Sequence, residues 1–263
     1  MPLHIIACVK QVPDPEAPAS SFRVDEAAKK VIAAAGVAPV ISQFDALAVE
    51  AALRIKDAAA DTKVTVVSLG PEGARDVIKH SLAMGADEGV LLTDGAFEGD
   101  SYTTALALSK AIEKIGDYNL VLCGRQATDW DAGVVGYGIA ELLGVASVSL
   151  AKAVTIQDGK VVVERVLMEG YDTVEAPLPA LVTVSNELGE PRYPKLQQIM
   201  MAARKQVTVW GAGDIGFASS GVRANLERLF QPVSEVECEV VEGETPDEAA
   251  QKLAQRLRDQ KII

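Results

Sequence analysis

The most constraining feature of this sequence is a strand, a glycine-bearing turn and a helix, in that order, over residues 117–144. Residues 119–123 are a short apolar run, which is typical of a buried parallel strand. A polar turn begins at Gly124. Three glycines then open an amphipathic segment: Gly133, Gly136 and Gly138. This order of elements suits phosphate, because the free N–H groups and the positive dipole end of a helix N-terminus point the same way.

The glycine spacing alone leaves two interpretations open. Gly-x-x-Gly-x-Gly is neither the dinucleotide fingerprint nor a P-loop. An ordinary strand-to-helix connection also uses glycines and aspartates as turn and capping residues. The rest of the chain has to decide between a phosphate site and a plain connection.

The same alternation of strand and helix runs through residues 3–144. It predicts strands at 3–9, 63–69, 88–92 and 119–123, and helices at 45–59, 72–84, 101–115 and 133–144. Such a pattern specifies an α/β fold of three layers, doubly wound around a mostly parallel sheet with right-handed crossovers. The loops that follow Val9, Leu69, Leu92 and Cys123 then gather at one edge, where folds of this type bind ligands.

The pattern changes after residue 144. Asp158-Gly159 between residues 153–156 and 160–166 predicts a hairpin, and a third antiparallel strand is expected at 168–175. Further elements are expected as short pairing near 22–24, a strand at 180–184, a helix at 196–203 and a strand at 207–210. Residues 211–263 have little apolar content apart from a helix at 245–258 and an edge strand or extended arm at 233–241. We therefore predict a domain at 1–210 and a C-terminal arm at 211–263 that packs on another protein.

Composition excludes several function classes. The net charge of −12 provides no basic stripe for nucleic acid. No run reaches the ~18 apolar residues of a membrane span, and no export signal precedes residue 3, so we expect a cytoplasmic protein. The three cysteines are widely spaced, and His4 and His80 have no partners at metal or triad spacing. No catalytic residue and no metal site are predicted.

Four segments resemble the β subunits of electron transfer flavoproteins, and the resemblance runs along the whole chain. The segments are CVKQVPD at 8–14, SLAMGADEGVLLTD at 81–94, GRQATDWD at 124–131 and the stretch 163–200, which contains LPALVTVSNELGEPRYPKLQQIM. The resemblance implies a fold like that of the adenine nucleotide alpha hydrolases. It also implies a heterodimer with an α subunit that carries electrons between flavin-containing dehydrogenases and a downstream acceptor.

The resemblance implies two kinds of nucleotide. A redox-active FAD is shared with the α subunit, and the β subunit holds either AMP, in the common type, or a second FAD, in a bifurcating type that takes hydride from NADH. Such a chain is an electron carrier subunit rather than a catalyst on its own, and it oxidises NADH only in the bifurcating type. The lack of a catalytic acid or base agrees with this, because the flavin supplies the chemistry.

The resemblance also implies a set of cofactor-binding residues. They are Ala7, Cys8, Ser42, Phe44, Leu69, Asp94, Asp100, Ser101, Thr104, Gly124, Arg125, Gln126, Asp129, Ala132, Gly133, Val134, Val135 and Gly136. The N–H groups of 133–136 are expected to take the phosphate, Ala7, Cys8 and Leu69 to line an adenine pocket, and Phe44 to face the α-bound flavin. Asp100, Ser101 and Thr104 are expected to help hold a longer nucleotide.

A second set, in the loop 186–193, is expected to contact the dehydrogenase. An exposed Leu188 is the anchor, with Glu190, Pro191, Arg192 and Tyr193 beside it.

Two alternatives stay open at this point. Ser42-Gln43 and Gly133-Val134-Val135 depart from the common pattern, while 93–105 resembles the bifurcating type in length and polarity, so either AMP or FAD fits. A stand-alone nucleotide-binding regulatory module of the universal stress or adenine-nucleotide hydrolase type would use the same turn. Such a module predicts a homodimer and has no use for residues 211–263.

Overall fold

The structure is a computed structural model, and it describes residues 2–18, 21–32, 36–232 and 238–263. Its contacts divide the chain into two units, Met1–Leu229 and Phe230–Ile263. The second unit holds one helix, α6 (Pro246–Asp259), which confirms the helix expected at 245–258. Thr245 caps it by accepting the N–H of Glu248, and none of its residues is buried. Of the strand or arm expected at 233–241, residues 233–237 lie outside the described residues and 238–241 have no regular secondary structure.

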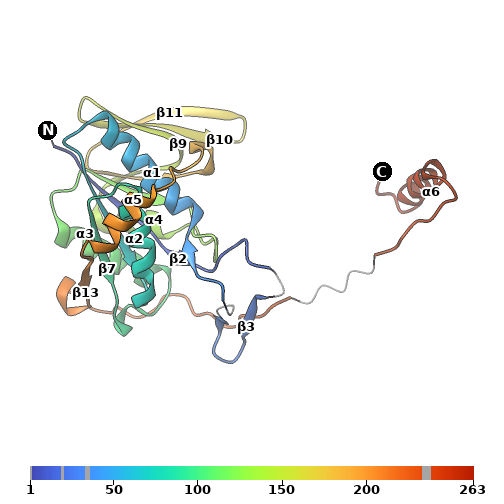
Figure 1. Cartoon of the computed structure of the whole chain (residues 1–263), viewed down its shortest axis with the longest axis horizontal. Helices are drawn as coiled ribbons and strands as arrows, with labels where there is room; N and C mark the ends of the chain where they lie inside the picture. Colours follow the sequence, from blue (N-terminus) through green and yellow to red (C-terminus); the bar gives the residue numbers. More distant parts are fainter. Residues whose placement is uncertain (1, 19–20, 33–35, 233–237) are drawn as a thin grey trace. The chain divides into compact units, whose positions relative to one another are not determined.

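The first unit is built on one large sheet (Figure 1). Its strands are β1 (His4–Cys8), β6 (Lys63–Leu69), β7 (Glu88–Leu92), β8 (Leu120–Gly124), β9 (Ala146–Gln157), β10 (Lys160–Leu167), β11 (Gly170–Pro177), β12 (Ala180–Val184) and β13 (Thr208–Trp210). They lie in the order β11-β10-β9-β12-β8-β1-β6-β7-β13. In this order, every neighbouring pair in the part β9-β12-β8-β1-β6-β7-β13 is parallel, whereas β10 pairs antiparallel with both β9 and β11. This confirms the mostly parallel sheet with a small antiparallel addition.

Two small antiparallel pairs accompany the sheet. β2 (Gln11–Val12) pairs with β5 (Val40–Ile41), and β3 (Arg23–Asp25) pairs with β4 (Lys30–Ile32). The second pair confirms the short pairing expected near residue 23.

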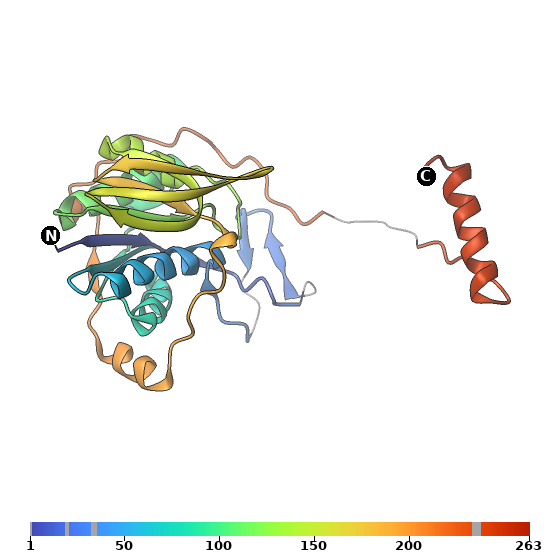
Figure 2. The same ribbon diagram turned by 90° about the horizontal axis from the view of Figure 1, so that it is seen from above.

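Helices cover both faces of the large sheet and complete the three layers (Figure 2). They are α1 (Gln43–Ala58), α2 (Arg75–Met84), α3 (Ser101–Ile115), α4 (Val135–Leu143) and α5 (Leu196–Arg204). Ile5 belongs to the apolar cluster beneath α1 and α2, whereas its neighbour Ile6 belongs to the cluster beneath α3 and α4. Both side chains are at most 1% exposed, as expected of a parallel strand covered on both faces.

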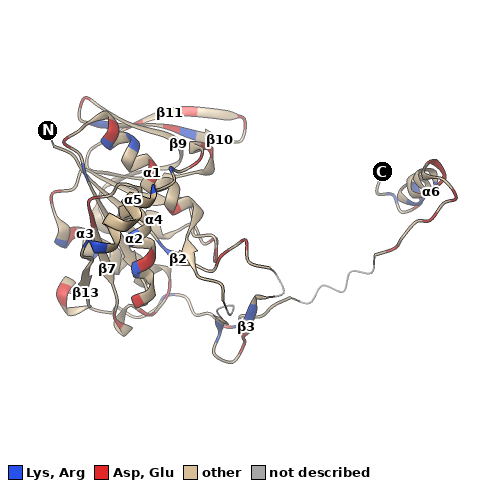
Figure 3. Cartoon of the chain, viewed as in Figure 1, with Lys and Arg blue, Asp and Glu red and all other residues tan. Residues whose placement is uncertain are grey.

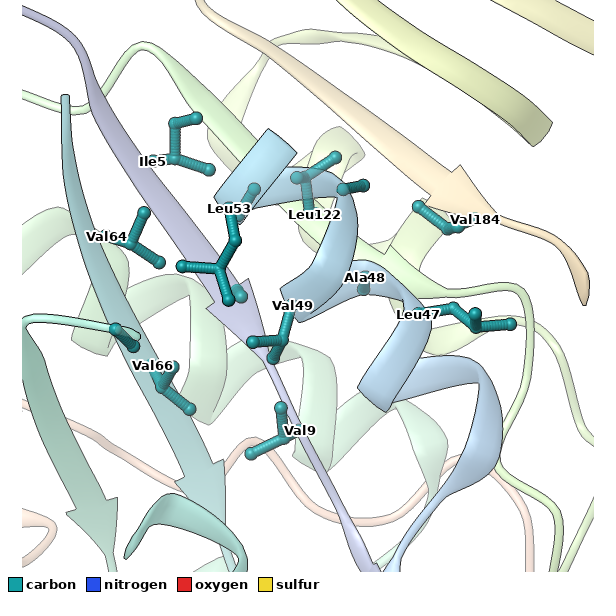
Figure 4. Close-up of a cluster of buried hydrophobic side chains, with 14 of the residues drawn as sticks. Ile5, Val9, Leu47, Ala48, Val49, Leu53, Val64, Val66, Leu122 and Val184 are labelled. Atoms are coloured by element: carbon teal, nitrogen blue, oxygen red, sulfur yellow. The ribbon is translucent and has the colours of Figure 1, made fainter. Parts of the chain in front are cut away.

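Helix α1 lies across the middle of the sheet. Figure 4 shows Leu47, Val49 and Leu53 of this helix in one cluster of buried side chains with Ile5, Val9, Leu122 and Val184, and Leu53 lies nearest to Ile5. Because the apolar positions of α1 recur at helical spacing, one face of the helix is continuously buried. This packing fixes the first turn of α1 beside the ends of β1 and β8.

Two local expectations differ from the structure. The helix expected at 72–84 starts as a 3-10 turn, Glu72–Ala74, and becomes α-helical only at Arg75. Strand β9 begins at Ala146 rather than at residue 153, because residues before 153 pair in parallel with β12 across an irregularity near Val182. That long-range pairing leaves no alternating pattern in the sequence.

Charged residues of both signs are interspersed along the elements (Figure 3). Some pair across neighbouring strands, as Lys63 does with Glu88 and Lys160 with Glu175. Among the described residues, no helix has the length and apolarity needed to cross a bilayer.

Candidate nucleotide site

A cavity of about 550 Å³ opens at the carboxyl ends of β1, β6 and β8. This is the edge that the topology predicts, and the volume falls in the range of small-molecule sites. The cavity brings together most of the residues expected to bind a cofactor: Cys8, Leu69, Asp100, Ser101, Thr104, Gly124, Arg125, Gln126, Ala132, Gly133, Val134, Val135 and Gly136. They come from four separate segments of the chain.

One wall of the cavity is the turn that leads into α4. Gly133 has a φ of +63°, in the left-handed region that glycine tolerates best, and Val134 precedes the first helical residue. The N–H groups of residues 133–136 donate no hydrogen bond to another residue within the described parts of the chain. Backbone donors without partners at a helix N-terminus, on the wall of a cavity, are suited to bind an anion such as phosphate.

Two cations lie beside these donors. Arg125 lines the cavity, its guanidinium lies 4.8 Å from the centre of the Phe44 ring, and its Nε is buried without a hydrogen-bond partner. Lys10 also lines the cavity, and its Nζ lies 2.7 Å from a carboxylate oxygen of Asp129. Both side chains bring positive charge to the wall of the cavity, which favours an anion.

The floor of the cavity is fixed by a buried acid, Asp45, in the first turn of α1. Its two carboxylate oxygens accept the N–H of Lys10, at 2.9 Å, and that of Gly124, at 3.1 Å. The side chain therefore ties together the chain just after β1 and the end of β8. Burial raises the pKa of Asp45 to about 7, against the lowering effect of the two N–H donors.

Several expected cofactor residues lie outside the cavity lining. Ala7 is fully buried within the sheet, Ser42 is buried with its hydroxyl unpartnered, and Phe44 packs against Arg125. Asp129 pairs with Lys10, and Asp94 accepts the N–H groups of Ala96 and Ala212.

The sequence analysis missed other lining residues: Val9, Lys10, Asp45, Gly99, Leu108, Cys123, Ala127, Trp130, Ile139, Ala224, Asn225 and Leu226. Most of them adjoin expected residues along the chain. An acid in the first turn of an apolar helix was the available signal for Asp45, although helix capping explains such an acid equally well. No motif or periodicity in the sequence around residues 224–226 indicated that they line the cavity.

The expectation that Leu188 is exposed is wrong for this chain. The side chain is 7% exposed and belongs to the apolar cluster beneath α1. Arg54 of α1 donates to the carbonyl of Leu188 at 3.0 Å, and Arg192 donates to Glu50 at 2.7 Å. These bonds hold the loop against the helix, whereas Tyr193, a few residues on, is 89% exposed.

The residues that line the cavity suit a nucleotide better than a metal ion. The described residues include no group of three or more His, Cys, Asp or Glu side chains placed to hold a metal. Apolar side chains such as Leu69 and Ile139 and the free backbone donors line the same space, which suits a base and a phosphate respectively.

Comparison with known proteins supports one family. The family model described as "Electron transfer flavoprotein domain" matches residues 29–215. The electron transfer flavoprotein subunit beta of Thermoanaerobacterium thermosaccharolyticum is 40% identical over 99% of this chain and 100% of its own length. The caffeyl-CoA reductase-Etf complex subunit CarD of Acetobacterium woodii is 37% identical, and the β subunit of Megasphaera elsdenii is 35% identical, over the same shares of each chain. The chain belongs to the electron transfer flavoprotein family and is of the β-subunit type.

Proposed function

We propose that this chain is the β subunit of a heterodimeric electron transfer flavoprotein and that its cavity holds an adenine nucleotide. The partner is an α subunit, with which it shares a redox-active FAD near the interface. Together the two subunits pass electrons from flavin-containing dehydrogenases to a downstream acceptor in the cytoplasm.

The observation that carries the proposal is the set of unpartnered N–H groups at 133–136, on the wall of a cavity at the carboxyl edge of the sheet. These donors hold the nucleotide phosphate, with the positive end of α4 behind them. The apolar lining near Cys8 and Leu69 takes the adenine.

The residues of this chain bind and orient, and the flavin supplies the redox chemistry when it is bound. Arg125 lines the cavity, so the positive charge of its guanidinium offsets part of the phosphate charge. The loop 186–193 presents its exposed Tyr193 to the dehydrogenase. Leu188 is buried and supports that loop from inside rather than contacting the dehydrogenase.

Two nucleotides compete for the cavity. AMP needs only the phosphate turn and the adenine pocket. A second FAD, as in a bifurcating carrier, needs further polar contacts, and the lining residues Ser101 and Thr104 favour this alternative.

The test is a count of nucleotides in the complex of this chain with its α subunit, made by denaturing the complex and separating the released nucleotides. One FAD and one AMP per heterodimer indicate the plain carrier, and two FAD with reduction by NADH indicate the bifurcating type. A complex without flavin, or a chain that forms only homodimers and never binds an α subunit, refutes the proposal and supports the regulatory module.

A further inference from the structure

One wall of the cavity is formed by a segment that follows the sheet by more than ten residues. Ala224, Asn225 and Leu226 line the cavity together with residues of β1, β6 and β8. They belong to the same unit as the sheet, Met1–Leu229. The chain therefore returns from β13 to the ligand edge before the unit ends.

Asp100 holds this segment in place. One of its carboxylate oxygens accepts the N–H of Arg223 at 2.7 Å and that of Ala224 at 2.8 Å. The other accepts the N–H of Thr103 at 2.9 Å and so caps α3. Donation from these N–H groups keeps the pKa of Asp100 well below its usual range, so the carboxylate is charged at neutral pH.

Two further contacts fix the same segment. The Arg223 guanidinium lies 4.0 Å from the centre of the Tyr102 ring, in the first turn of α3. On the other side, Lys29 next to the β3–β4 pair donates to the carbonyl of Leu226 at 2.6 Å. The segment 223–226 is thus held both from α3 and from the β3–β4 pair.

We propose that segment 223–226 is a latch that closes the nucleotide cavity and that Asp100 is the positioning residue that holds the latch shut. The inference deepens the proposed function and rests on it. Release of the nucleotide then requires the segment to leave Asp100. The nucleotide therefore dissociates slowly, and its dissociation rate depends on Asp100 even though the Asp100 carboxylate need not contact the nucleotide.

The latch assigns Asp100 a different role from that of a nucleotide ligand. All four of the hydrogen bonds at its carboxylate come from its own chain: two from Thr103 and one each from Arg223 and Ala224. A negative charge beside a phosphate also weakens binding through Coulomb repulsion. Loss of the charge alone should tighten nucleotide binding, whereas loss of the latch should loosen it, so the two effects have opposite signs.

Asp100→Ser separates the latch from the helix cap. Serine is as good an N-cap as aspartate, so the cap of α3 survives, but one short hydroxyl cannot also reach the N–H groups of residues 223 and 224. Ala224→Pro breaks the same contact from the other side, because proline has no N–H to donate. The charge control is Glu98→Ser, since Glu98 is exposed and its side chain forms no hydrogen bond or ion pair with the described residues.

The experiment uses the full-length chain in complex with its α subunit, loaded with radiolabelled AMP, whose structure is also part of FAD. The release of label is followed after addition of excess unlabelled AMP. We expect Asp100→Ser and Ala224→Pro each to speed release about tenfold, because charge-assisted hydrogen bonds are the stronger class. Glu98→Ser should leave release unchanged or slow it.

Hydrogen exchange measured by mass spectrometry on the same complexes gives a readout that does not depend on the ligand. The amides of residues 223 and 224 should be protected in the wild type and exposed in Asp100→Ser, while those of α3 stay protected in both. Should Asp100→Ser fail to fold, Ala224→Pro carries the test alone.

The possible outcomes separate a failure of the latch from a failure of the nucleotide site. A wild-type complex that retains AMP, combined with release from both variants within twofold of wild type, overturns the latch and leaves the proposed function standing. A wild-type complex that retains no AMP overturns the AMP site and the latch with it.

Discussion

Asp45→Asn tests whether burial at the cavity floor destabilises the ionised form of Asp45. In the wild type, Asp45 is 7% exposed as a residue, and its carboxylate accepts the N–H groups of Lys10 and Gly124. Burial is the largest influence and raises the pKa from 3.8 to about 7. Asparagine has nearly the same shape and is never charged, but its amide has only one oxygen to accept the two N–H groups.

The sign and size of the pH effect follow from linkage. The folded state binds the proton of Asp45 more tightly than the unfolded chain does, so folding stability is lost as the pH rises from about 4 to about 7. A difference of about three pKa units corresponds to about 4 kcal/mol at 1.36 kcal/mol per unit. Well below the unfolded-state pKa of 3.8 the acid is protonated in both states, and the penalty is absent.

Urea unfolding of the full-length wild type and of Asp45→Asn, from about pH 4.5 to about pH 8, measures the effect. Acids with lowered pKa values, such as Glu50 and Asp172, make both proteins more stable as pH rises, so they cancel in the difference. We expect the wild type to lose about 3 kcal/mol relative to the variant across this range. A second contribution, which does not change with pH, destabilises the variant by about 1–3 kcal/mol, because one buried N–H group has no acceptor.

The refuting result is a difference between the two proteins that stays constant, within about 0.5 kcal/mol, from the acid end of the range to the basic end. Such a result means that the two N–H donors and the positive end of α1 together compensate burial fully. Asp45 is then an ordinary ionised acid.

Two other substitutions test the packing around the site. Gly124→Ala should cost about 1–3 kcal/mol of stability, since its Cβ would lie 2.5 Å from the Asp45 carboxylate. Gly95→Ala, whose Cβ meets nothing within 4 Å, is the control for thermal unfolding, and equal losses would contradict the clash. Glu50→Gln should cost about 1–3 kcal/mol and speed proteolysis of the loop 186–193, because two arginines lose a charged acceptor that is 6% exposed. Glu113→Gln, in an exposed pair, should change stability by less than about 0.5 kcal/mol, and similar losses in both variants would refute the role of Glu50.

Local pattern was sufficient for most of the parallel strands, for their covering helices and for the edge at which the cavity lies. Helix α3 spans the residues expected, 101–115, because an N-capping acid and a terminal glycine mark both of its ends. The parallel strands are continuous apolar runs, and topology then brings the loops after them to one edge. The position of the cavity follows from these two facts, whereas the individual lining residues were expected from the family resemblance.

The parts that sequence reasoning missed depend on contacts between distant residues. Leu188 is buried because the loop around it is tied to α1, through an Arg192–Glu50 bond that joins residues 142 positions apart. Residues 224–226 reach the cavity because Asp100 accepts N–H groups 123 and 124 positions away. No periodicity or turn signal encodes such pairings, since each partner is also compatible with an ordinary surface position.

Three acids at or near the carboxyl edge of the sheet share one physical role, although the family resemblance implies that two of them, Asp94 and Asp100, bind the cofactor. Asp45 accepts N–H groups from the ends of two strands, Asp94 from Ala212, and Asp100 from the segment 223–226. A site for an anion gains nothing from a free carboxylate, but a carboxylate whose oxygens already bind backbone N–H groups repels a phosphate less and fixes the chain around it. Asp45 and Asp100 therefore help to set the shape of the cavity, and the N–H groups at 133–136, which have no partner among the described residues, are the donors that the proposed function assigns to the phosphate.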